Sequence, residues 1–336
     1  MEKENTFGSV TSSRNSGVIH AGVYYDKDSM KAKFCADGNR RMYEYCQKFN
    51  VPHINTGKFI VATSPNEIPK LEEIFSKAEY NGVEGIERVT GNYVTSKEPL
   101  VECIEALFVP SSGIVDQNSL MRSYLGELEE SSGNIVFNSQ FLRTEIHGEK
   151  YCSTVLSDGE EIIIESSVII NAAGLNAENI ANNILPLDKK YIPKTYFAKG
   201  NYFETGKDLK IRHLIYPIPN DASLGLHLGL DLGMQVRFGP DVEWVDEIDY
   251  KVKKDRQVLF HNDVIKYIPS IKIEDLKAGY SGVRPKLKNK GEGKSDFLIQ
   301  GEETHGIKNL VNLFGMESPG LTSSLVIGEY VTDMIN

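Results

Sequence analysis

The stretch EIIIESSVIINAAGLNAENIANNIL, residues 161–185, decides the fold class of this 336-residue chain. A run rich in β-branched residues ends at Asn171, and three small residues, Ala172, Ala173 and Gly174, lead into a helical pattern. A unit of strand, tight turn and helix is typical of an α/β protein. Its small residues let a ligand approach the backbone, and the free N–H groups of the new helix favour an anion. The alternative is an ordinary connection in which the small residues only serve packing, and this stretch alone leaves both open.

A second unit of the same kind lies in NLFGMESPGLTSSLVIGEYV, residues 312–331. Gly315 and Gly320 bound its loop, and Thr322 or Ser323 can begin the helix that follows. A helix start beside a loop bounded by glycines again suits a polar or anionic ligand group. Two such units in one chain favour a ligand-binding α/β fold more than either unit does alone.

The remaining sequence divides into helices and strands by its periodicity. Apolar residues recur at helical spacing within residues 26–50, where Asp28 or Ser29 can cap the helix and Pro52 can end it. The residues Ser-Asp-Gly at 157–159 predict a β-hairpin turn. Further helices are expected over 68–82, 117–133 and near 251–267, and strands over 57–64, 134–140, 149–159, 160–174 and much of 191–280. The expected fold class is α/β, with a mainly antiparallel sheet inserted into it.

Composition limits the function and the compartment. The hydrophobic content of 40% and charged content of 25% are typical of a globular domain. A net charge of -10 argues against nucleic acid or an anionic membrane surface as the main partner. The sequence has no apolar run long enough for a membrane span and no apolar leader at its N-terminus. Its four cysteines form no CxxC pair, so we expect a cytoplasmic protein.

Six motifs occur along the chain in an order that carries a family resemblance: SSRNSGVIHAGVYY (12–25), GKFIVAT (57–63), VIINAAG (168–174), FGPDVEW (238–244), YSGVRPK (280–286) and FGMESPGLTSSLVIGEYV (314–331). The first and last motifs are the specific ones, because NAAG is shared more widely. With these motifs the chain resembles the L-2-hydroxyglutarate dehydrogenase/oxidase family, which are FAD-dependent oxidoreductases of the D-amino-acid-oxidase-like superfamily. The resemblance extends over essentially all 336 residues.

The resemblance implies a discontinuous Rossmann-like FAD-binding domain with an inserted, mainly antiparallel substrate-binding domain. The FAD-binding domain would comprise residues 1–50, 110–178 and 281–336, and the substrate-binding domain residues 51–109 and 179–280. The implied reaction is oxidation of L-2-hydroxyglutarate, or a close 2-hydroxy acid, to the 2-oxo acid by hydride transfer to flavin N5. The implied electron acceptor is a quinone or oxygen, and the implied location includes peripheral association with the inner face of a membrane.

The resemblance also implies roles for particular residues. In the family, the segment that matches residues 12–22 lies along the flavin, which would place His20 near the isoalloxazine ring. An imidazole there can take a proton, so His20 is a candidate catalytic base, whereas outside this context a core histidine is the simpler interpretation. The residues implied to contact FAD are Glu2, Ser12, Ser13, Asn15, Ser16, Gly17, Ala172, Ala173, Gly174, Gly315, Glu317, Ser318, Gly320, Leu321 and Thr322.

The substrate site draws its candidates from the inserted sheet. His227 is the second candidate base, with a side chain that points either into the pocket or away from it. Arg284 is the expected carboxylate clamp because a guanidinium binds a carboxylate bidentately, the alternative being a surface charge. Tyr216, Tyr280 and Lys199 are further candidates for substrate contacts, and both tyrosines suit a core equally well. No metal is expected, because the other histidines lack the spacing of a metal site: His53, His147, His213, His261 and His305.

One expected part of an FAD site is missing from the sequence. A dinucleotide-binding fold begins with a strand, a GxGxxG turn and a helix, followed by a strand whose final acid binds ribose. The chain contains no GxGxxG, and Glu2 matches the ribose-binding acid. About 30 residues of the first unit are therefore expected to be absent. Three interpretations stay open: a fragment of a longer protein, which we favour, a truncated and degenerate product, or a site completed by another chain.

Two other classes of function compete with the leading interpretation. An oxidase or dehydrogenase of amino acids, amines or glycerol 3-phosphate would share NAAG but not both of the specific motifs. A phosphate substrate would also require more arginine and lysine near the pocket than the sequence offers. An inactive remnant that lacks the FAD pyrophosphate site would bind no flavin, which separates it from both enzymes.

Overall fold

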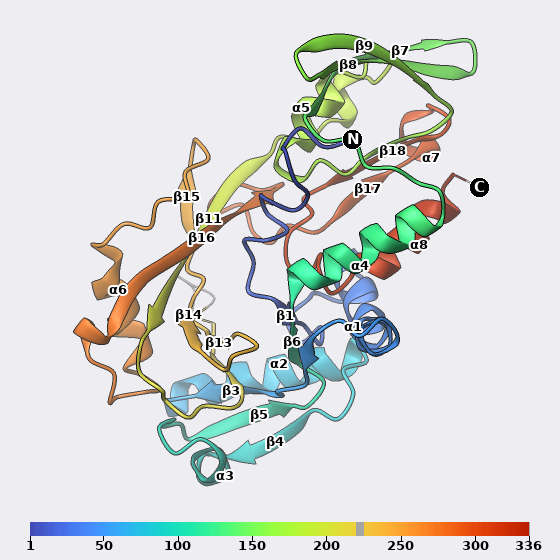
Figure 1. Ribbon diagram of the computed structural model, residues 1–336. Helices are drawn as coiled ribbons and strands as arrows, with labels where there is room; N and C mark the ends of the chain where they lie inside the picture. The colour runs from blue at the N-terminus through green and yellow to red at the C-terminus, as the bar shows by residue number, and fades with distance from the viewer. Residues whose placement is uncertain (220–224, 336) are drawn as a thin grey trace.

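A computed structural model describes residues 1–219 and 225–335, and within these residues the strands form four sheets (Figure 1). The largest sheet contains β3 (Lys58–Ala62), β4 (Glu87–Thr90), β5 (Glu105–Val109), β11 (Tyr196–Thr205), β12 (Leu214–Pro217), β13 (Leu228–Leu230), β14 (Val236–Phe238), β15 (Glu243–Val245) and β16 (Leu276–Lys286). The helices are α1 (Met30–Lys48), α2 (Ile68–Tyr80), α3 (Gly91–Lys97), α4 (Gln117–Glu130), α5 (Ala177–Asn182), α6 (Arg256–Val264), α7 (Glu302–His305) and α8 (Ser324–Asp333). The predicted α/β class is confirmed.

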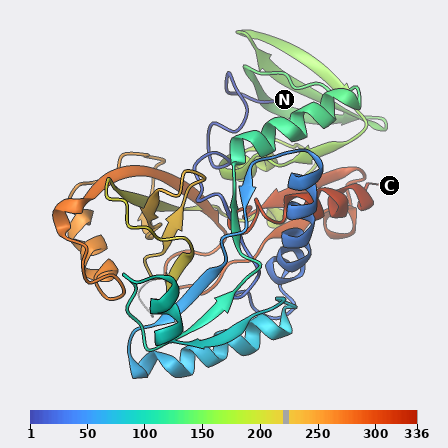
Figure 2. The ribbon, with the colours of Figure 1, turned by 60° about the horizontal axis from the view of Figure 1, so that its bottom comes forward.

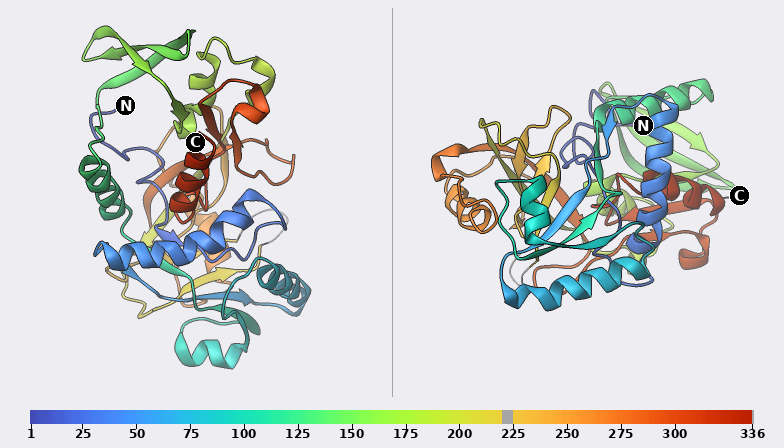
Figure 3. Two further views of the ribbon diagram at one scale, coloured as in Figure 1. Left: turned by 90° about the vertical axis from the view of Figure 1, so that its right-hand side faces the viewer. Right: turned by 90° about the horizontal axis from the view of Figure 1, so that it is seen from below.

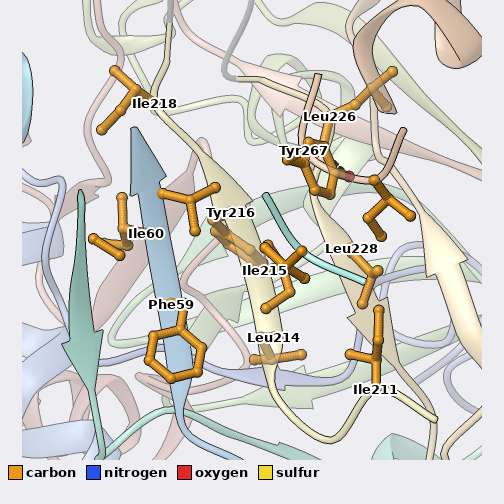
Figure 4. Packing of buried hydrophobic residues seen from close by; sticks show 14 of the residues in the cluster. Phe59, Ile60, Ile211, Leu214, Ile215, Tyr216, Ile218, Leu226, Leu228 and Tyr267 are labelled. Carbon is orange, nitrogen blue, oxygen red and sulfur yellow. Dashed lines mark hydrogen bonds between the residues drawn. The ribbon is translucent and has the colours of Figure 1, made fainter. Parts of the chain in front are cut away.

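Two distant parts of the chain build the large sheet. The parallel pair β3·β12 joins them, with Lys58 opposite Leu214 and Ile60 opposite Tyr216. The other strand pairs of this sheet are antiparallel, as the inserted sheet was expected to be. Every residue of β3 is buried, because α2 lies along β3 and β5 (Figure 2) and apolar side chains of β12 and β13 pack beside it (Figure 4).

The predicted division into domains has a counterpart in this sheet. Its strands come from residues 51–109 and 179–280, which are the intervals predicted for the substrate-binding domain, and β16 continues to Lys286. Residues 220–224, which fall within the second interval, lie outside the described residues. The division itself stays a prediction.

A smaller sheet with parallel strands forms the other side of the molecule. Its strands are β10 (Ile169–Asn171), β18 (Leu310–Phe314) and β17 (Leu298–Gln300), with β10 and β18 parallel and β17 antiparallel to β18. A buried hydrogen bond of 2.9 Å from Asn171 Nδ2 to Asn312 Oδ1 fixes the parallel pair. Helices α1 and α8 pack against each other beside it (Figure 3). The remaining sheets are β1 (Val18–Ile19), β6 (Gly113–Val115) and β2 (His53–Ile54), and β7 (Ser139–His147), β8 (Lys150–Ser157) and β9 (Glu160–Ser166).

Most local predictions are confirmed. Ser29 caps α1, accepting a hydrogen bond of 3.1 Å from the Ala32 N–H to its Oγ. The hairpin turn between β8 and β9 has Asp158 and Gly159 at φ of 48° and 90°, as a type I′ turn requires. The predicted helices over 68–82 and 117–133 correspond to α2 and α4. The helix after the glycine-bounded loop, α8, begins directly after Ser323, whose side chain makes no capping hydrogen bond.

Two predicted boundaries are wrong, and each has a physical reason. Residues 134–138 were expected to begin a strand, but β7 starts at Ser139 because the preceding backbone pairs with residues 2–4. The helix expected from residue 251 begins at Arg256 as α6. The carbonyl of Lys251 accepts instead from the buried Lys199 ammonium, at 2.6 Å.

Gly38 allows α1 to lie directly against the segment that begins α8. A Cβ at this position would be 2.6 Å from the Thr322 carbonyl oxygen and 2.9 Å from Ser323 Cα. Both atoms belong to the backbone, so a rotamer change cannot relieve the contact. Glycine lowers the helix propensity of α1, and the close packing explains why a glycine nevertheless stands at this position.

We expect Gly38→Ala to lower the free energy of unfolding by about 1–3 kcal/mol, because overpacking forces the backbone apart. Gly126→Ala in α4 is the matched control, since a Cβ there meets no atom within 4 Å. That control should be neutral or stabilised by up to about 1 kcal/mol through helix propensity. Urea denaturation of both variants measures this, and equal stabilities would contradict the packing assignment.

Candidate active site

Two predicted ligand loops leave the same edge of the small sheet. Because β10 and β18 are parallel, with Asn171 opposite Asn312, residues 172–174 and 315–322 both follow the carboxyl ends of their strands. This edge is where open α/β sheets bind ligands. Gly174 has a φ of 57°, which favours glycine, and a Cβ on it would meet no atom within 4 Å. Open space therefore remains beside the turn.

The C-terminal loop is attached to β1 through Thr322 and Ser318. Thr322 Oγ1 accepts from the His20 N–H at 3.0 Å and donates to the Val18 carbonyl at 3.3 Å. The Ser318 hydroxyl lies 3.2 Å from His20 Nε2. The structure thus brings together His20, Ser318 and Thr322, which lie about 300 positions apart in the sequence.

Glu317 anchors this loop to two other segments. Its Oε1 accepts from Lys31 Nζ of α1 at 2.7 Å and from Lys286 Nζ of β16 at 2.6 Å. Burial alone would raise the pKa of Glu317, but the two ammonium groups outweigh burial and hold the pKa below its ordinary value. The carboxylate predicted to contact FAD is therefore already held by two lysines.

The surroundings of His20 keep its imidazole neutral. Desolvation, with smaller contributions from the positive charges of Lys58 and His227, lowers the pKa of His20 to about 3. The His227 ring stacks on Tyr216 with centroids 3.6 Å apart, and Lys58 Nζ lies 4.6 Å from the Tyr216 centroid. The two candidate bases and Tyr216 are thus brought into one cluster.

A second cluster lies where the N-terminal loop crosses β11 and β16. The Tyr280 hydroxyl donates to the Asn15 carbonyl at 2.7 Å, and its ring stacks on Tyr202 with centroids 4.4 Å apart. Arg284 donates to the Asp241 carbonyl at 3.2 Å. Burial raises the pKa of Tyr202, and the nearby Arg284 opposes that rise. Arg284 and Tyr280 therefore share one neighbourhood.

The N-terminal loop is held by hydrogen bonds within itself and to other segments. Asn15 Nδ2 donates to the Ser12 carbonyl at 2.6 Å, and Asn15 Oδ1 accepts from the Gly17 N–H at 2.8 Å. The Ser13 carbonyl accepts from Gln117 at 3.3 Å, and Ser16 lowers the pKa of the nearby Tyr202. A Cβ on Gly282 would overlap the Arg14 carbonyl oxygen, so glycine on β16 lets this loop pass.

Two predicted residues lie apart from these clusters. Lys199 donates to Asp249 Oδ2 at 3.0 Å and to the Lys251 carbonyl at 2.6 Å, so its ammonium group already has two acceptors within the protein. Glu2 Oε1 accepts from the Glu4 N–H at 3.0 Å, beside the strand pairing of residues 2–4. Their predicted ligand contacts stay predictions.

Sequence reasoning missed Lys58, Tyr24 and Tyr202. Each contacts or electrostatically influences a predicted residue. Tyr24 and Lys58 lie within the motifs at 12–25 and 57–63, but neither was singled out as a site residue. Lys58 offered one signal, because an ionisable residue in the apolar run KFIVA is unusual for a buried strand.

The residues present fit part of an FAD molecule. The edge beside Gly174 is open, and a cavity of about 340 Å³ runs along the N-terminal loop, where the buried Ser9 hydroxyl lacks a hydrogen-bond partner among the described residues. This cavity is lined by Thr6, Phe7, Gly8, Ser9, Ser13, Asn118 and Arg122. With no GxGxxG in the sequence, these residues account for only some of the contacts that the cofactor needs.

Ligand loops at the carboxyl edge of parallel strands, beside a large and mainly antiparallel sheet, agree with the architecture that the family resemblance implies. A family model described as FAD dependent oxidoreductase matches residues 1–334, and the chain belongs to that family. This membership confirms the predicted superfamily and the FAD dependence of its chemistry.

Curated relatives and solved structures agree with this assignment. The mitochondrial L-2-hydroxyglutarate dehydrogenase of Arabidopsis thaliana is 37% identical over 372 aligned residues, covering 99% of this chain and 77% of that protein. The Homo sapiens protein of the same name is 27% identical, covering 100% and 82%. Dithionite-reduced L-alpha-glycerophosphate oxidase from Mycoplasma pneumoniae, with FAD bound, superposes with a TM-score of 0.86 at 22% identity, covering 100% and 87%. That structural likeness shows the fold alone.

Across the described residues, no helix combines the length and the apolar character needed to cross a membrane. The cysteines within them are free thiols, and Cys35 and Cys46 are buried in α1.

The pKa of His20 predicts a specific loss of stability in acid. The folded pKa of about 3 lies below the ordinary histidine value of 6.5, so the unfolded chain binds the proton more readily. The contribution of His20 to the stability of the folded protein is therefore present above pH 6.5 and is lost as the pH falls toward 3. Between pH 7 and 5 we expect the free energy of unfolding to fall by about 2 kcal/mol more in the wild type than in His20→Gln.

Urea denaturation at both pH values measures this difference. His147→Gln is the control, because that side chain is 67% exposed and should leave the wild-type pH dependence unchanged. Parallel pH dependences in the wild type and His20→Gln would show that His20 is not held neutral by its surroundings.

Proposed function

We propose that this protein oxidises L-2-hydroxyglutarate, or a close 2-hydroxy acid, to the 2-oxo acid in an FAD-dependent reaction. The observation that carries the proposal is the neutral His20 imidazole, held against Ser318 and Thr322 at the carboxyl edge of the small sheet. The 37% identical relative in Arabidopsis thaliana, named for this activity, supports the choice of substrate.

The chemistry that FAD supplies when bound is acceptance of the hydride from substrate C2. The proposed task of His20 is to take the hydroxyl proton at Nε2, so that the carbon loses a hydride and the oxygen loses a proton. The Thr322 hydroxyl fixes the His20 backbone, and the Ser318 hydroxyl orients its ring. His227, stacked on Tyr216, is the second candidate for the same proton transfer.

Arg284 is the proposed carboxylate clamp. A guanidinium has five N–H donors, and the structure records one of them on the Asp241 carbonyl. No carboxylate of the described residues lies within ion-pair distance of Arg284, which leaves it suited to a substrate anion. Tyr280 and Tyr216 complete the proposed substrate contacts, and the predicted contact of Lys199 would require its ammonium to exchange its hydrogen bonds with Asp249 and the Lys251 carbonyl.

The cofactor contacts are proposed from both loops and the N-terminal segment. The loop after β10 would contribute Ala172, Ala173 and Gly174, and the loop after β18 would contribute the residues 315–322 predicted above. The electron acceptor is proposed to be a quinone or oxygen, in a cytoplasmic protein that associates peripherally with a membrane. This part rests on the family resemblance.

Visible absorption spectra of the purified chain, with and without added FAD, test the proposal. Flavin bands that bleach when L-2-hydroxyglutarate is added anaerobically are the expected result. His20→Asn should bind FAD equally and bleach at least 100-fold more slowly, because general-base catalysis contributes about that much. D-2-hydroxyglutarate and L-glycerol 3-phosphate serve as control substrates.

Two outcomes would overturn the proposal. Bleaching by L-glycerol 3-phosphate or an amino acid alone would assign the chain to a different oxidase activity. If the purified chain binds no FAD even when FAD is added in excess, it is the inactive remnant that the missing GxGxxG also allows.

A further inference from the structure

Lys58 is a buried ammonium group without a counter-charge. It is the first residue of β3, it is 0% exposed, and its Nζ has no hydrogen-bond partner within the part of the chain described. Taking an ammonium out of water costs several kcal/mol unless an anion or several acceptors compensate. A lysine in this state indicates a place where an anion belongs.

Two other buried lysines show the contrast. Lys31 is 7% exposed and pairs with Glu317, and Lys199 is 0% exposed and pairs with Asp249. Each of these has a carboxylate within 3.0 Å, supplied by a residue distant in sequence. Lys58 is equally buried, and no acid of the described residues pairs with it.

Two aromatic rings lie close to Lys58. Its Nζ lies 4.6 Å from the Tyr216 centroid and 5.9 Å from the Tyr24 centroid. The Tyr24 hydroxyl is also buried without a hydrogen-bond partner among the described residues. The Lys58 ammonium and the hydroxyl of the neighbouring Tyr24 are thus two buried donors that lack an acceptor.

This donor pair belongs to the neighbourhood of the candidate base. Lys58 is the larger of the two charged influences that lower the pKa of His20. Tyr216, which contacts Lys58, also senses the charge of Tyr202, and Tyr202 in turn senses Arg284. Lys58 and Arg284 are therefore linked through Tyr216 and Tyr202, as two cations that could receive two carboxylates.

We propose that Lys58, assisted by the Tyr24 hydroxyl, binds one carboxylate of a dicarboxylic substrate, while Arg284 binds the other. This inference rests on the proposed function and deepens it, because it makes Lys58 the residue that selects a 2-hydroxy dicarboxylate over a monocarboxylate. The carboxylate accepts the two donors that the protein leaves unsatisfied.

The same pairing would prepare His20 for proton transfer. In the ligand-free protein the positive charge of Lys58 opposes protonation of the imidazole. A carboxylate on Lys58 cancels that charge and raises the pKa of His20 toward the range in which a histidine serves as a base. Substrate binding and base strength are thus coupled through Lys58.

Glutarate and butyrate separate binding from turnover, because neither carries a hydroxyl group to oxidise. In thermal unfolding of the FAD-supplemented chain, glutarate should raise the Tm of the wild type and butyrate should not. Lys58→Met should abolish the glutarate shift while leaving the ligand-free Tm equal or higher, because it removes an unpaired buried charge. Lys58→Gln gives the same test if the methionine variant does not fold.

Kinetics provide the second readout. Lys58→Met should lower kcat/KM for L-2-hydroxyglutarate by about 10- to 100-fold, the loss expected for one charge-assisted hydrogen bond. The value for L-2-hydroxybutyrate, which has a single carboxylate, should change by less than about 3-fold because that substrate has no second carboxylate for Lys58 to bind. Lys150→Met, which removes an exposed charge on β8, is the control and should match the wild type in both assays.

The outcomes distinguish the two proposals. If L-2-hydroxyglutarate reduces the wild type but Lys58→Met retains the glutarate shift and the preference for the dicarboxylate, the role of Lys58 is overturned and the proposed function stands. If no 2-hydroxy acid reduces the wild type while Lys58→Met abolishes the glutarate shift, the carboxylate site stands and the proposed function fails. A large fall in the ligand-free Tm of both Lys58 variants would identify a structural lysine and overturn the inference.

Discussion

The carboxylate of Glu317 holds together three segments on which the site depends. It is buried, so it is stable as an anion only because Lys31 and Lys286 both donate to it. One lysine comes from α1 and the other from the end of β16, so this single group ties the C-terminal loop to both sides of the molecule. The positions of Ser318 and Thr322, and through them of His20, follow from that attachment.

Close backbone packing complements this electrostatic anchor. Gly38 lets α1 approach the backbone at the start of α8, and Gly282 lets the N-terminal loop cross β16. The first contact packs α1 against the loop that carries Thr322, and the second packs the N-terminal loop against β16, which carries Arg284. The geometry around His20 is therefore set by rigid elements rather than by the loops alone, which is what a proton-transfer site requires.

The large sheet contributes the charged and aromatic part of the site. The parallel pairing of β3 with β12 sets Lys58 near Tyr216, and the antiparallel pairing of β12 with β13 brings His227 onto the Tyr216 ring. The small sheet contributes the open edge and the loop that holds His20. The site is thus assembled where the two sheets face each other, and neither contains a complete set of groups.

The sequence by itself determined the features that depend on near neighbours. The helix α1 with its Ser29 cap, the turn at Asp158 and Gly159, and the strand–turn–helix units follow from periodicity and turn chemistry, which act over a few residues. The ordered motifs also carried the family resemblance and with it His20, Ser318 and Thr322.

Only the tertiary structure decided which charged groups are paired. Lys31, Lys199 and Lys58 look alike in the sequence, but Glu317 lies 286 positions from Lys31 and Asp249 lies 50 from Lys199, whereas Lys58 has no paired acid among the described residues. The strand boundary at Ser139 likewise depended on the distant residues 2–4. Burial and pairing are sums over contacts between remote segments, so no local pattern reports them, and they are what gives Lys58 its character.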